Sequence, residues 1–232
     1  MKASRCVVLF SRSSQNEGAM KGMPGRDRIF AFSARRVTEA VRALDRVDLV
    51  LAGPGTAPEG ARVLPQRGNG FGERLQNAFE DARALGYAEI LAVPGDVPGI
   101  SAAHLDTAFR ALGTHDVVLG PSPDGGVWLI GLRARAAAVS KLFRRVPWLT
   151  GDVLSSLVRN APGAALLHAL RDVDRAADLA RLAADRDLDP VLDALLRSLG
   201  PVTGPTKRVR RMARRQPRLV APSRAPPARL AA

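Results

Sequence analysis

Short apolar runs alternate with longer segments of helical period along most of this chain, and this alternation restricts the possible folds most strongly. An apolar run bounded by glycine, proline or polar turn residues predicts a buried strand. Strands that alternate with helices predict an α/β domain with a mainly parallel sheet. The expected strands are residues 7–10, 48–52, 61–64, 89–93, 117–119, 127–132 and 165–168.

Between the strands, apolar side chains recur three and four residues apart, which is the spacing of the buried face of a helix. A further helix is expected after Thr150 as its N-cap, and two more at about 175–184 and 190–199. The last has Pro190 in its first turn and Gly200 as its stop. The expected core faces are Val37, Val41 and Leu44; Leu75, Ala78, Phe79 and Ala82; and Leu105, Ala108, Phe109 and Leu112.

The composition changes abruptly after Gly200. Residues 201–232 hold nine lysines and arginines, six prolines and no acidic residue, which predicts a disordered basic tail. The first 200 residues therefore keep only +4 of the formal net charge of +13, an ordinary balance for a domain. With 46% hydrophobic residues, a chain of 232 residues suits one core, so we expect a single domain in residues 1–200.

Several protein classes are disfavoured by the composition. The single cysteine, Cys6, excludes an intramolecular disulfide and fits a reducing cytoplasm. No apolar stretch approaches the ~20 residues of a membrane span, so we expect a soluble cytoplasmic protein. His104, His115 and His168 lack the spacing of a zinc site and are expected to be structural or surface residues.

Residues 89–100, EILAVPGDVPGI, combine a buried strand with a carboxylate just beyond its end. In an open α/β sheet, the ligand crevice lies outside the carboxyl ends of the strands, where Asp96 is expected. Magnesium and manganese take oxygen ligands, commonly carboxylates together with substrate phosphates. Asp96 is therefore a candidate metal ligand, although its side chain suits the cap of a turn or helix equally well.

Residues 120–132, GPSPDGGVWLIGL, place Asp124, Gly125 and Gly126 between two strands. An Asp-Gly pair is first of all a hairpin signal. The two glycines also let a ligand approach the backbone, and Trp128 offers a large amphipathic ring to a sugar or a base. The pattern predicts a turn and leaves a ligand site as the alternative.

Residues 170–174, LRDVD, place Asp172 and Asp174 on the same side of an extended segment. Such a pair can favour the start of the following helix through the helix dipole. It can equally supply further metal ligands from across the sheet. The pattern leaves both interpretations open.

The segment LPQRGNGFGERL is a glycine-rich loop that leads into a helix. Its backbone N–H groups and the positive end of the helix dipole suit a phosphate, with Arg67 and Arg74 as partners. Its glycines do not have the spacing of a dinucleotide motif, and the Lys-Ser/Thr pair of a Walker loop is absent. A solvated surface loop is the alternative.

In this order and at these intervals, the four segments resemble the bacterial family known as DUF2064, which is similar to type-A glycosyltransferases and nucleotide-diphospho-sugar transferases. Its members carry a QRG…GERL loop, a GSDxPGL-like turn, LGPxxDGGYYLIGL, PWST and LxDVDTxxDL. The residues that correspond to these five motifs here are 66–75, 95–100, 119–132, 147–150 and 170–179. The Lys-Thr-Arg triplet that family members usually carry after the first strand is absent from this chain.

The resemblance implies a Rossmann-like, three-layer sandwich of GT-A type, with helices on both faces of a mainly parallel sheet. It implies a divalent metal, Mg²⁺ or Mn²⁺, held by Asp96 and Asp174 with Asp172. Asp96 and Asp124 are then the candidate catalytic residues.

The same resemblance implies where the substrates lie. The nucleotide is expected near Gly70, Gly72 and Arg74, with Arg67 as a further phosphate partner. The sugar or acceptor is expected along Asp124–Trp128, which includes Gly125 and Gly126.

Three functions follow from these expectations. The first is a metal-dependent, glycosyltransferase-like enzyme that uses a nucleotide-activated sugar and an unknown acceptor. The alternative is a nucleotidyltransferase that joins an NTP to a small phosphorylated acceptor and releases pyrophosphate. The third is a domain without catalysis whose basic tail binds nucleic acid non-specifically through its phosphates.

Overall fold

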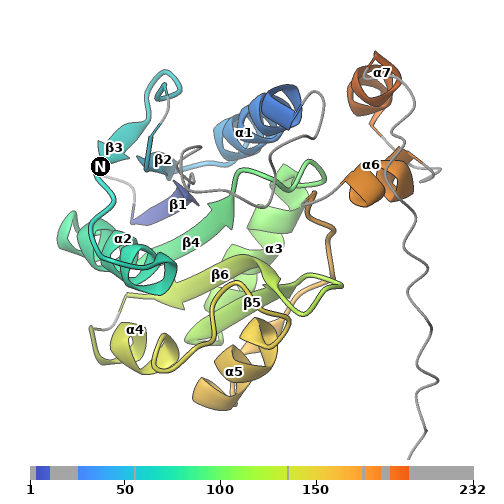
Figure 1. Cartoon of the computed structure of the whole chain (residues 1–232). Coiled ribbons are helices and arrows are strands. Elements are labelled where there is room, and N and C mark those ends of the chain that lie inside the picture. Colours follow the sequence, from blue (N-terminus) through green and yellow to red (C-terminus); the bar gives the residue numbers. More distant parts are fainter. Residues whose placement is uncertain are drawn as a thin grey trace, which may run out of the picture.

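Seven strands form one sheet in the order β3-β2-β1-β4-β6-β5-β7 (Figure 1). The computed structural model describes residues 4–10, 26–54, 56–134, 136–173, 176–183 and 189–198. Every strand expected from the apolar runs is present, although the last is shorter than predicted. The strands are β1 (Arg5–Phe10), β2 (Val47–Ala52), β3 (Arg62–Leu64), β4 (Glu89–Pro94), β5 (Val117–Pro121), β6 (Val127–Arg133) and β7 (Ala165–Leu166).

The carboxyl ends of the parallel strands lie at the same edge of the sheet. β6 runs antiparallel to β4 and β5, and the other neighbouring pairs are parallel. β1 and β4 are buried along nearly their whole length, including the thiol-bearing Cys6, because helices cover both faces. We call the edge where the parallel strands end the carboxyl edge. It is formed by the last residues of those strands and by the first residue of β6, which are Phe10, Ala52, Leu64, Pro94, Pro121, Leu166 and Val127.

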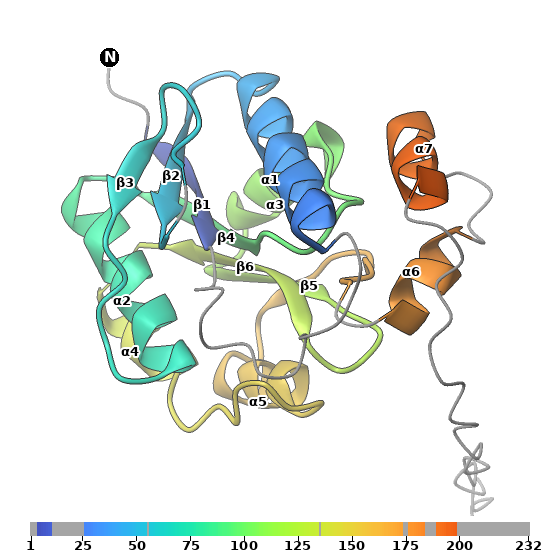
Figure 2. The same cartoon turned by 45° about the horizontal axis from the view of Figure 1, so that its top comes forward.

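Helices cover both faces of the sheet, which confirms the expected three-layer α/β architecture. α2, α4 and α5 pack on one face, and α1 and α3 pack on the other (Figures 1 and 2). The predicted apolar faces of α2 and α3 are buried. The helices are α1 (Arg26–Arg42), α2 (Phe71–Ala84), α3 (Ala102–Leu112), α4 (Ala136–Leu142), α5 (Val153–Asn160), α6 (Ala176–Ala183) and α7 (Pro190–Ser198).

Two local predictions differ from the structure. α5 begins at Val153 with Asp152 as its N-cap, so the assignment of Thr150 as the cap was wrong. Thr150 instead closes the preceding turn, because its Oγ1 donates to the Pro147 carbonyl at 2.7 Å and accepts from the Asp152 N–H at 3.2 Å. α4 was not predicted, although Val139 and Leu142, three residues apart, form its buried face.

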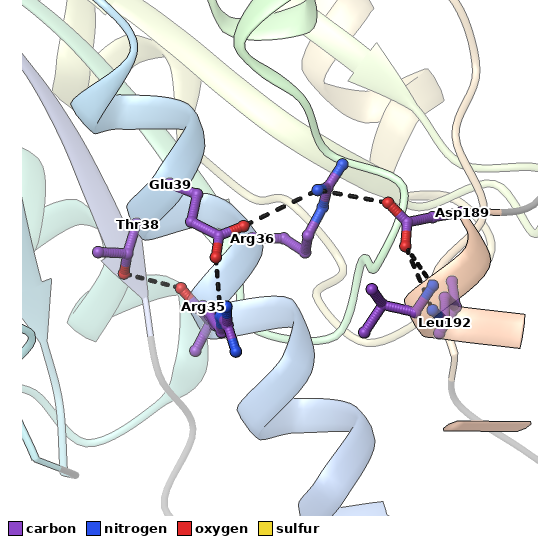
Figure 3. A network of polar contacts seen from close by, with 8 residues as sticks. Arg35, Arg36, Thr38, Glu39, Asp189 and Leu192 are labelled. Atoms are coloured by element: carbon purple, nitrogen blue, oxygen red, sulfur yellow. Dashed lines mark hydrogen bonds and ion pairs between the residues drawn. The ribbon is translucent and has the colours of Figure 1, made fainter. Parts of the chain in front are cut away.

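α6 and α7 lie to one side of the two helical layers, next to α1 (Figure 2). Arg36 of α1 pairs with Asp189 at 3.4 Å, and Asp189 Oδ1 accepts from the N–H groups of Val191 and Leu192 (Figure 3). Asp189 therefore caps α7 and fastens it to α1. Buried residues also join these helices in a separate apolar cluster, which contains Ile29, Val173, Leu179, Leu182, Leu192 and Leu196.

Candidate functional site

Asp96 lies at the carboxyl edge, just beyond β4 in the middle of the sheet. The residue is only 4% exposed, and the nearby Val97 and Ile100 are fully buried, so the turn is anchored in the core. A buried carboxylate needs hydrogen bonds, a charged partner or a metal ion to offset the loss of hydration. Asp96 therefore occupies the position where open α/β sheets bind their ligands.

Residues 167–173, here called the edge segment, run along the carboxyl edge after β7. The Leu167 N–H donates to the Leu119 carbonyl at 2.9 Å, and the Leu170 N–H donates to the Pro121 carbonyl at 3.2 Å. These bonds extend the pairing with β5 beyond the last strand. The edge segment is therefore held against the sheet by its backbone.

The edge segment ends against the Asp96 turn. The Val173 N–H donates to the Asp96 carbonyl at 3.0 Å, which places the half-buried Asp172 beside that turn. Asp174, the other acid expected there, lies outside the described residues. Two of the three predicted metal ligands are thus brought into one region by the main chain.

The donors in this region fit a hard divalent cation. No group of three His, Cys, Asp or Glu side chains within the described residues has the geometry to hold a metal by itself. Mg²⁺ and similar ions commonly bind through one or two carboxylates and complete their coordination with water and substrate phosphates. The carboxylates of Asp96 and Asp172 suit this type of site.

The glycine-rich loop before α2 is closed by its own glutamate. Glu73 Oε2 accepts from the Asn69 N–H at 2.8 Å, and its side chain packs against Gly68, whose φ is +126°. Gly70 is the N-cap, with open space where a Cβ would be. A phosphate at this helix start would meet the carboxylate of Glu73, which makes the start less favourable for anions than the loop composition indicated.

The two arginines of this segment have different surroundings. Arg67 pairs with Asp81 of α2, and its carbonyl accepts from Asn77 Nδ2 at 2.7 Å, so it fastens the loop to the helix. Arg74, in the first turn of α2, is half-buried. Its Nε is buried and has no hydrogen-bond acceptor among the described residues. Arg74 is therefore the better candidate for an anionic ligand.

Packing explains two of the glycines expected to contact substrate. A Cβ on Gly72 would clash with the indole nitrogen of Trp148. A Cβ on Gly125, whose φ is +94°, would clash with the Gly151 carbonyl. The Leu154 N–H also donates to the Gly125 carbonyl at 3.0 Å. The chain between Trp148 and Gly151 thus packs against both glycine-rich segments.

Asp124 stabilises the turn between β5 and β6. It is exposed, and its Oδ1 accepts from the Gly126 N–H at 2.9 Å. The Ser122 N–H donates to the Gly126 carbonyl at 3.0 Å, which closes the predicted hairpin. Because β6 is antiparallel, this turn lies at the carboxyl edge, as Asp96 does. The catalytic role of Asp124 stays a prediction.

Trp128 does not offer its ring to a ligand, which corrects the expectation that it contacts a sugar or base. It is 1% exposed, and its Nε1 donates to the His168 carbonyl at 3.0 Å. Its ring meets His104 edge to face, with 5.8 Å between the centroids, and a Cβ on Gly120 would clash with it. The indole is a core group that also holds the edge segment.

His104 closes the start of α3. Its Nδ1 accepts from the Ser101 N–H at 3.2 Å and lies 2.8 Å from Ser101 Oγ. Burial, and to a smaller degree the charge of His168, lowers the pKa of His104 below its ordinary value. These contacts agree with a structural role.

Three residues of this region, Glu73, Ser122 and Val173, were not predicted as functional from the sequence. A glutamate three residues after the N-cap, as Glu73 is after Gly70, is a signal for the start of a helix. The signal for Val173 was its place as an apolar residue between Asp172 and Asp174. Ser122 is 4% exposed, and its Oγ has no hydrogen-bond partner among the described residues, which no sequence pattern indicated.

A cavity of about 400 Å³ lies at the opposite end of the sheet, where β5 begins. None of the candidate site residues lines it. It is bounded by Thr114, His115, Asp116 and Val117, by Lys141 and Leu142, and by residues 160–164. The cavity is therefore separate from the carboxyl edge.

The segment after β1, which includes Lys21, Pro24 and Gly25, lies outside the described residues.

The stretch from β2 to the turn before α5 carries the family signature. Residues 51–150 match the family described as "Uncharacterized protein conserved in bacteria (DUF2064)". This match confirms the DUF2064 resemblance. The part that matches DUF2064 contains the glycine-rich loop, Asp96 and the Asp124 turn, and the edge segment follows it.

Two curated relatives are guanylyltransferases. The 2-phospho-L-lactate guanylyltransferase of Methanocaldococcus vulcanius is 28% identical over 75 residues, which cover 32% of this chain and 33% of that enzyme. The 3-phospho-D-glycerate guanylyltransferase of Phenylobacterium zucineum is 47% identical over 49 residues, which cover 21% of this chain and 22% of that enzyme. The matched segments thus span a third or less of these two relatives.

Solved structures share the fold. A protein of Desulfovibrio desulfuricans G20, assigned as a nucleotide-diphospho-sugar transferase, superposes with a TM-score of 0.70 at 22% identity, over 85% of this chain and 98% of its own. Rv0371c of Mycobacterium tuberculosis H37Rv, in complex with manganese, has a TM-score of 0.51 at 20% identity, over 78% and 98% of the two chains. Both have the α/β architecture described above.

No described helix has the length and apolar character that a membrane crossing requires.

Proposed function

We propose that this chain is a metal-dependent nucleotidyltransferase, which transfers a nucleoside monophosphate from an NTP to the phosphate of a small phosphorylated acid and releases pyrophosphate. The observation that carries the proposal is the buried Asp96 at the end of the central strand, with the edge segment bonded to it. The names of both curated relatives support this reaction. GTP is therefore the first donor to test, with 3-phospho-D-glycerate and 2-phospho-L-lactate as acceptors.

The reaction is a displacement at phosphorus. An oxygen of the acceptor phosphate attacks the α-phosphorus of the NTP, and the bond between that phosphorus and the oxygen bridging to the β-phosphate breaks. A divalent cation, when bound, offsets the negative charge on the phosphates. Asp96 and Asp172 are proposed to hold it through carboxylate oxygens, with Asp174 as a further ligand. The manganese bound to Rv0371c supports the choice of Mn²⁺ as a probe.

The remaining residues of the carboxyl edge are assigned by charge and access. The Arg74 guanidinium is proposed to bind the triphosphate, since its buried Nε has no acceptor among the described residues. The start of α2 at Gly70 is less suited to the triphosphate, because the Glu73 carboxylate accepts from the Asn69 N–H there. Asp124 and Gly126 are proposed to lie on the acceptor side, in the turn between β5 and β6.

The test is the Asp96→Asn variant, assayed for pyrophosphate release from GTP with each acceptor and Mn²⁺. We expect kcat/KM to fall at least about 100-fold, because a metal site contributes several kcal/mol to the stabilisation of phosphate charge. Asp106→Asn is the matched control, since Asp106 pairs with Arg110 on the outer side of α3. It should leave the activity unchanged.

Other outcomes of this assay distinguish the competing functions. Sugar transfer from a nucleotide sugar, with no pyrophosphate released from any NTP, would favour the glycosyltransferase. If deletion of residues 201–232 abolished the function while the domain bound no nucleotide, the basic tail would carry it instead.

A further inference from the structure

Val173 connects the Asp96 turn to the two helices that follow the edge segment. Its N–H donates to the Asp96 carbonyl at 3.0 Å. Its side chain is 1% exposed and belongs to the apolar cluster that contains Ile29 of α1, Leu179 of α6 and Leu192 of α7. The backbone of Val173 therefore contacts the candidate site, while its side chain is buried in the separate apolar cluster formed by α1, α6 and α7.

The core that holds Val173 is itself fastened to α1 by charge. Arg36 lies 3.4 Å from Asp189 and 3.8 Å from Glu39, so it links two acidic groups across the gap between α1 and α7. Asp189 also caps α7 through the N–H groups of Val191 and Leu192 (Figure 3). Neither residue of this pair is among those proposed above to bind the metal or the substrates.

We propose that α1, α6 and α7 form a brace that holds Asp172 beside Asp96, with Val173 as the positioning residue. The inference rests on the proposed metal site and adds the means by which it is preorganised. Asp172 directly precedes Val173, so fixing Val173 at both its backbone and its side chain restricts where the Asp172 carboxylate can lie. A segment without this brace would lose conformational entropy when a cation bound, and its affinity would be lower.

The side chain of Val173 carries no donor or acceptor, so it cannot bind a cation itself. Any effect of its truncation on metal affinity must act through the position of its neighbours. A general loss of stability would follow from truncating any buried valine of the same exposure. A matched valine elsewhere in the core therefore separates this loss from a specific effect on metal affinity. Val139 of α4 provides that comparison, since it is also 1% exposed and packs in the core on the other face of the sheet.

The experiment measures Mn²⁺ binding to the full chain by electron paramagnetic resonance of the free ion, without nucleotide, for the unmodified chain, Val173→Ala and Val139→Ala. We expect Val173→Ala to weaken Mn²⁺ binding about tenfold, the scale found when groups that orient metal ligands are removed. Val139→Ala should leave the affinity unchanged, although both variants lower the Tm. Asp189→Ala removes the cap of α7 and its ion pair with α1 without changing the edge segment. It should also weaken Mn²⁺ binding, and it tests the brace if Val173→Ala does not fold.

The outcomes separate this inference from the proposed function. If the unmodified chain binds no Mn²⁺, the metal site fails and the brace fails with it. If the unmodified chain binds Mn²⁺ and both Val173→Ala and Asp189→Ala match the Val139→Ala control, the metal site stands and the brace is wrong.

Discussion

Arg74 and Arg67 show how similar residues of one loop acquire different roles. Arg67 is paired with Asp81, whereas Arg74 keeps a buried Nε without an acceptor among the described residues. α2 begins against the end of β1, since the rings of Phe71 and Phe10 lie 5.6 Å apart. The Nε donor of Arg74 is thus available to a ligand near the carboxyl edge, whereas the charge of Arg67 is neutralised by Asp81.

Substitution of Arg74 by Gln should weaken GTP binding about 10- to 100-fold, because a hydrogen bond to a charged group contributes about 1.5–3 kcal/mol. Calorimetric titration of GTP into the full chain measures the effect. Arg83→Gln is the control, since Arg83 is an exposed arginine in the last turn of the same helix. Equal affinities for the two variants would remove Arg74 from the site.

At the scale of the element, the start of α3 depends on a neutral histidine. Nδ1 of His104 accepts from the Ser101 N–H, and an imidazolium has no lone pair there to accept this bond. Burial, with the charge of His168 as the lesser cause, lowers the pKa of His104 from its ordinary value of 6.5. The unfolded chain therefore takes up a proton at a higher pH than the folded chain.

We expect the stabilising contribution of His104 to be complete above pH 6.5, the ordinary pKa value, and to be lost as the pH falls from there through the lower pKa of the folded state. His104→Gln should remove this part of the pH dependence, since Gln keeps an acceptor for the helix start but does not titrate. Thermal unfolding of both chains, from neutral to mildly acidic pH, measures the difference. Parallel curves for the two would show that His104 does not contribute.

Most elements were predictable from the sequence, because the apolar runs of β1 and β4 and the spaced faces of α2 and α3 are buried as their patterns indicated. Asp96 was found because the end of a central strand is a topological position. The orientation of Trp128 was not, since strands covered on both faces lose the polar alternation that would show which side a residue faces. The cap of α5 depends on the turn geometry around Thr150, which the residue type alone does not fix.

For the whole molecule, the sheet separates two apolar cores, and α6 and α7 add a smaller cluster at the side. The candidate site draws on all three. Asp96 follows a strand that contributes to both large cores, and Val173 belongs to the small one. A ligand at the carboxyl edge that binds only the folded chain should therefore stabilise the central sheet and the side helices together.

The burial of Cys6 in β1 gives the chain a built-in reporter of this coupling. It is the only cysteine of the sequence, it is fully buried, and burial raises the pKa of its thiol. A thiol reagent should therefore label it only when the sheet opens, and saturating GTP with Mn²⁺ should slow the labelling further. Labelling as fast as that of a free thiol would contradict the burial. Followed by mass spectrometry, one sulfur atom would then report ligand binding in crude extracts, where no purified enzyme or known acceptor is needed.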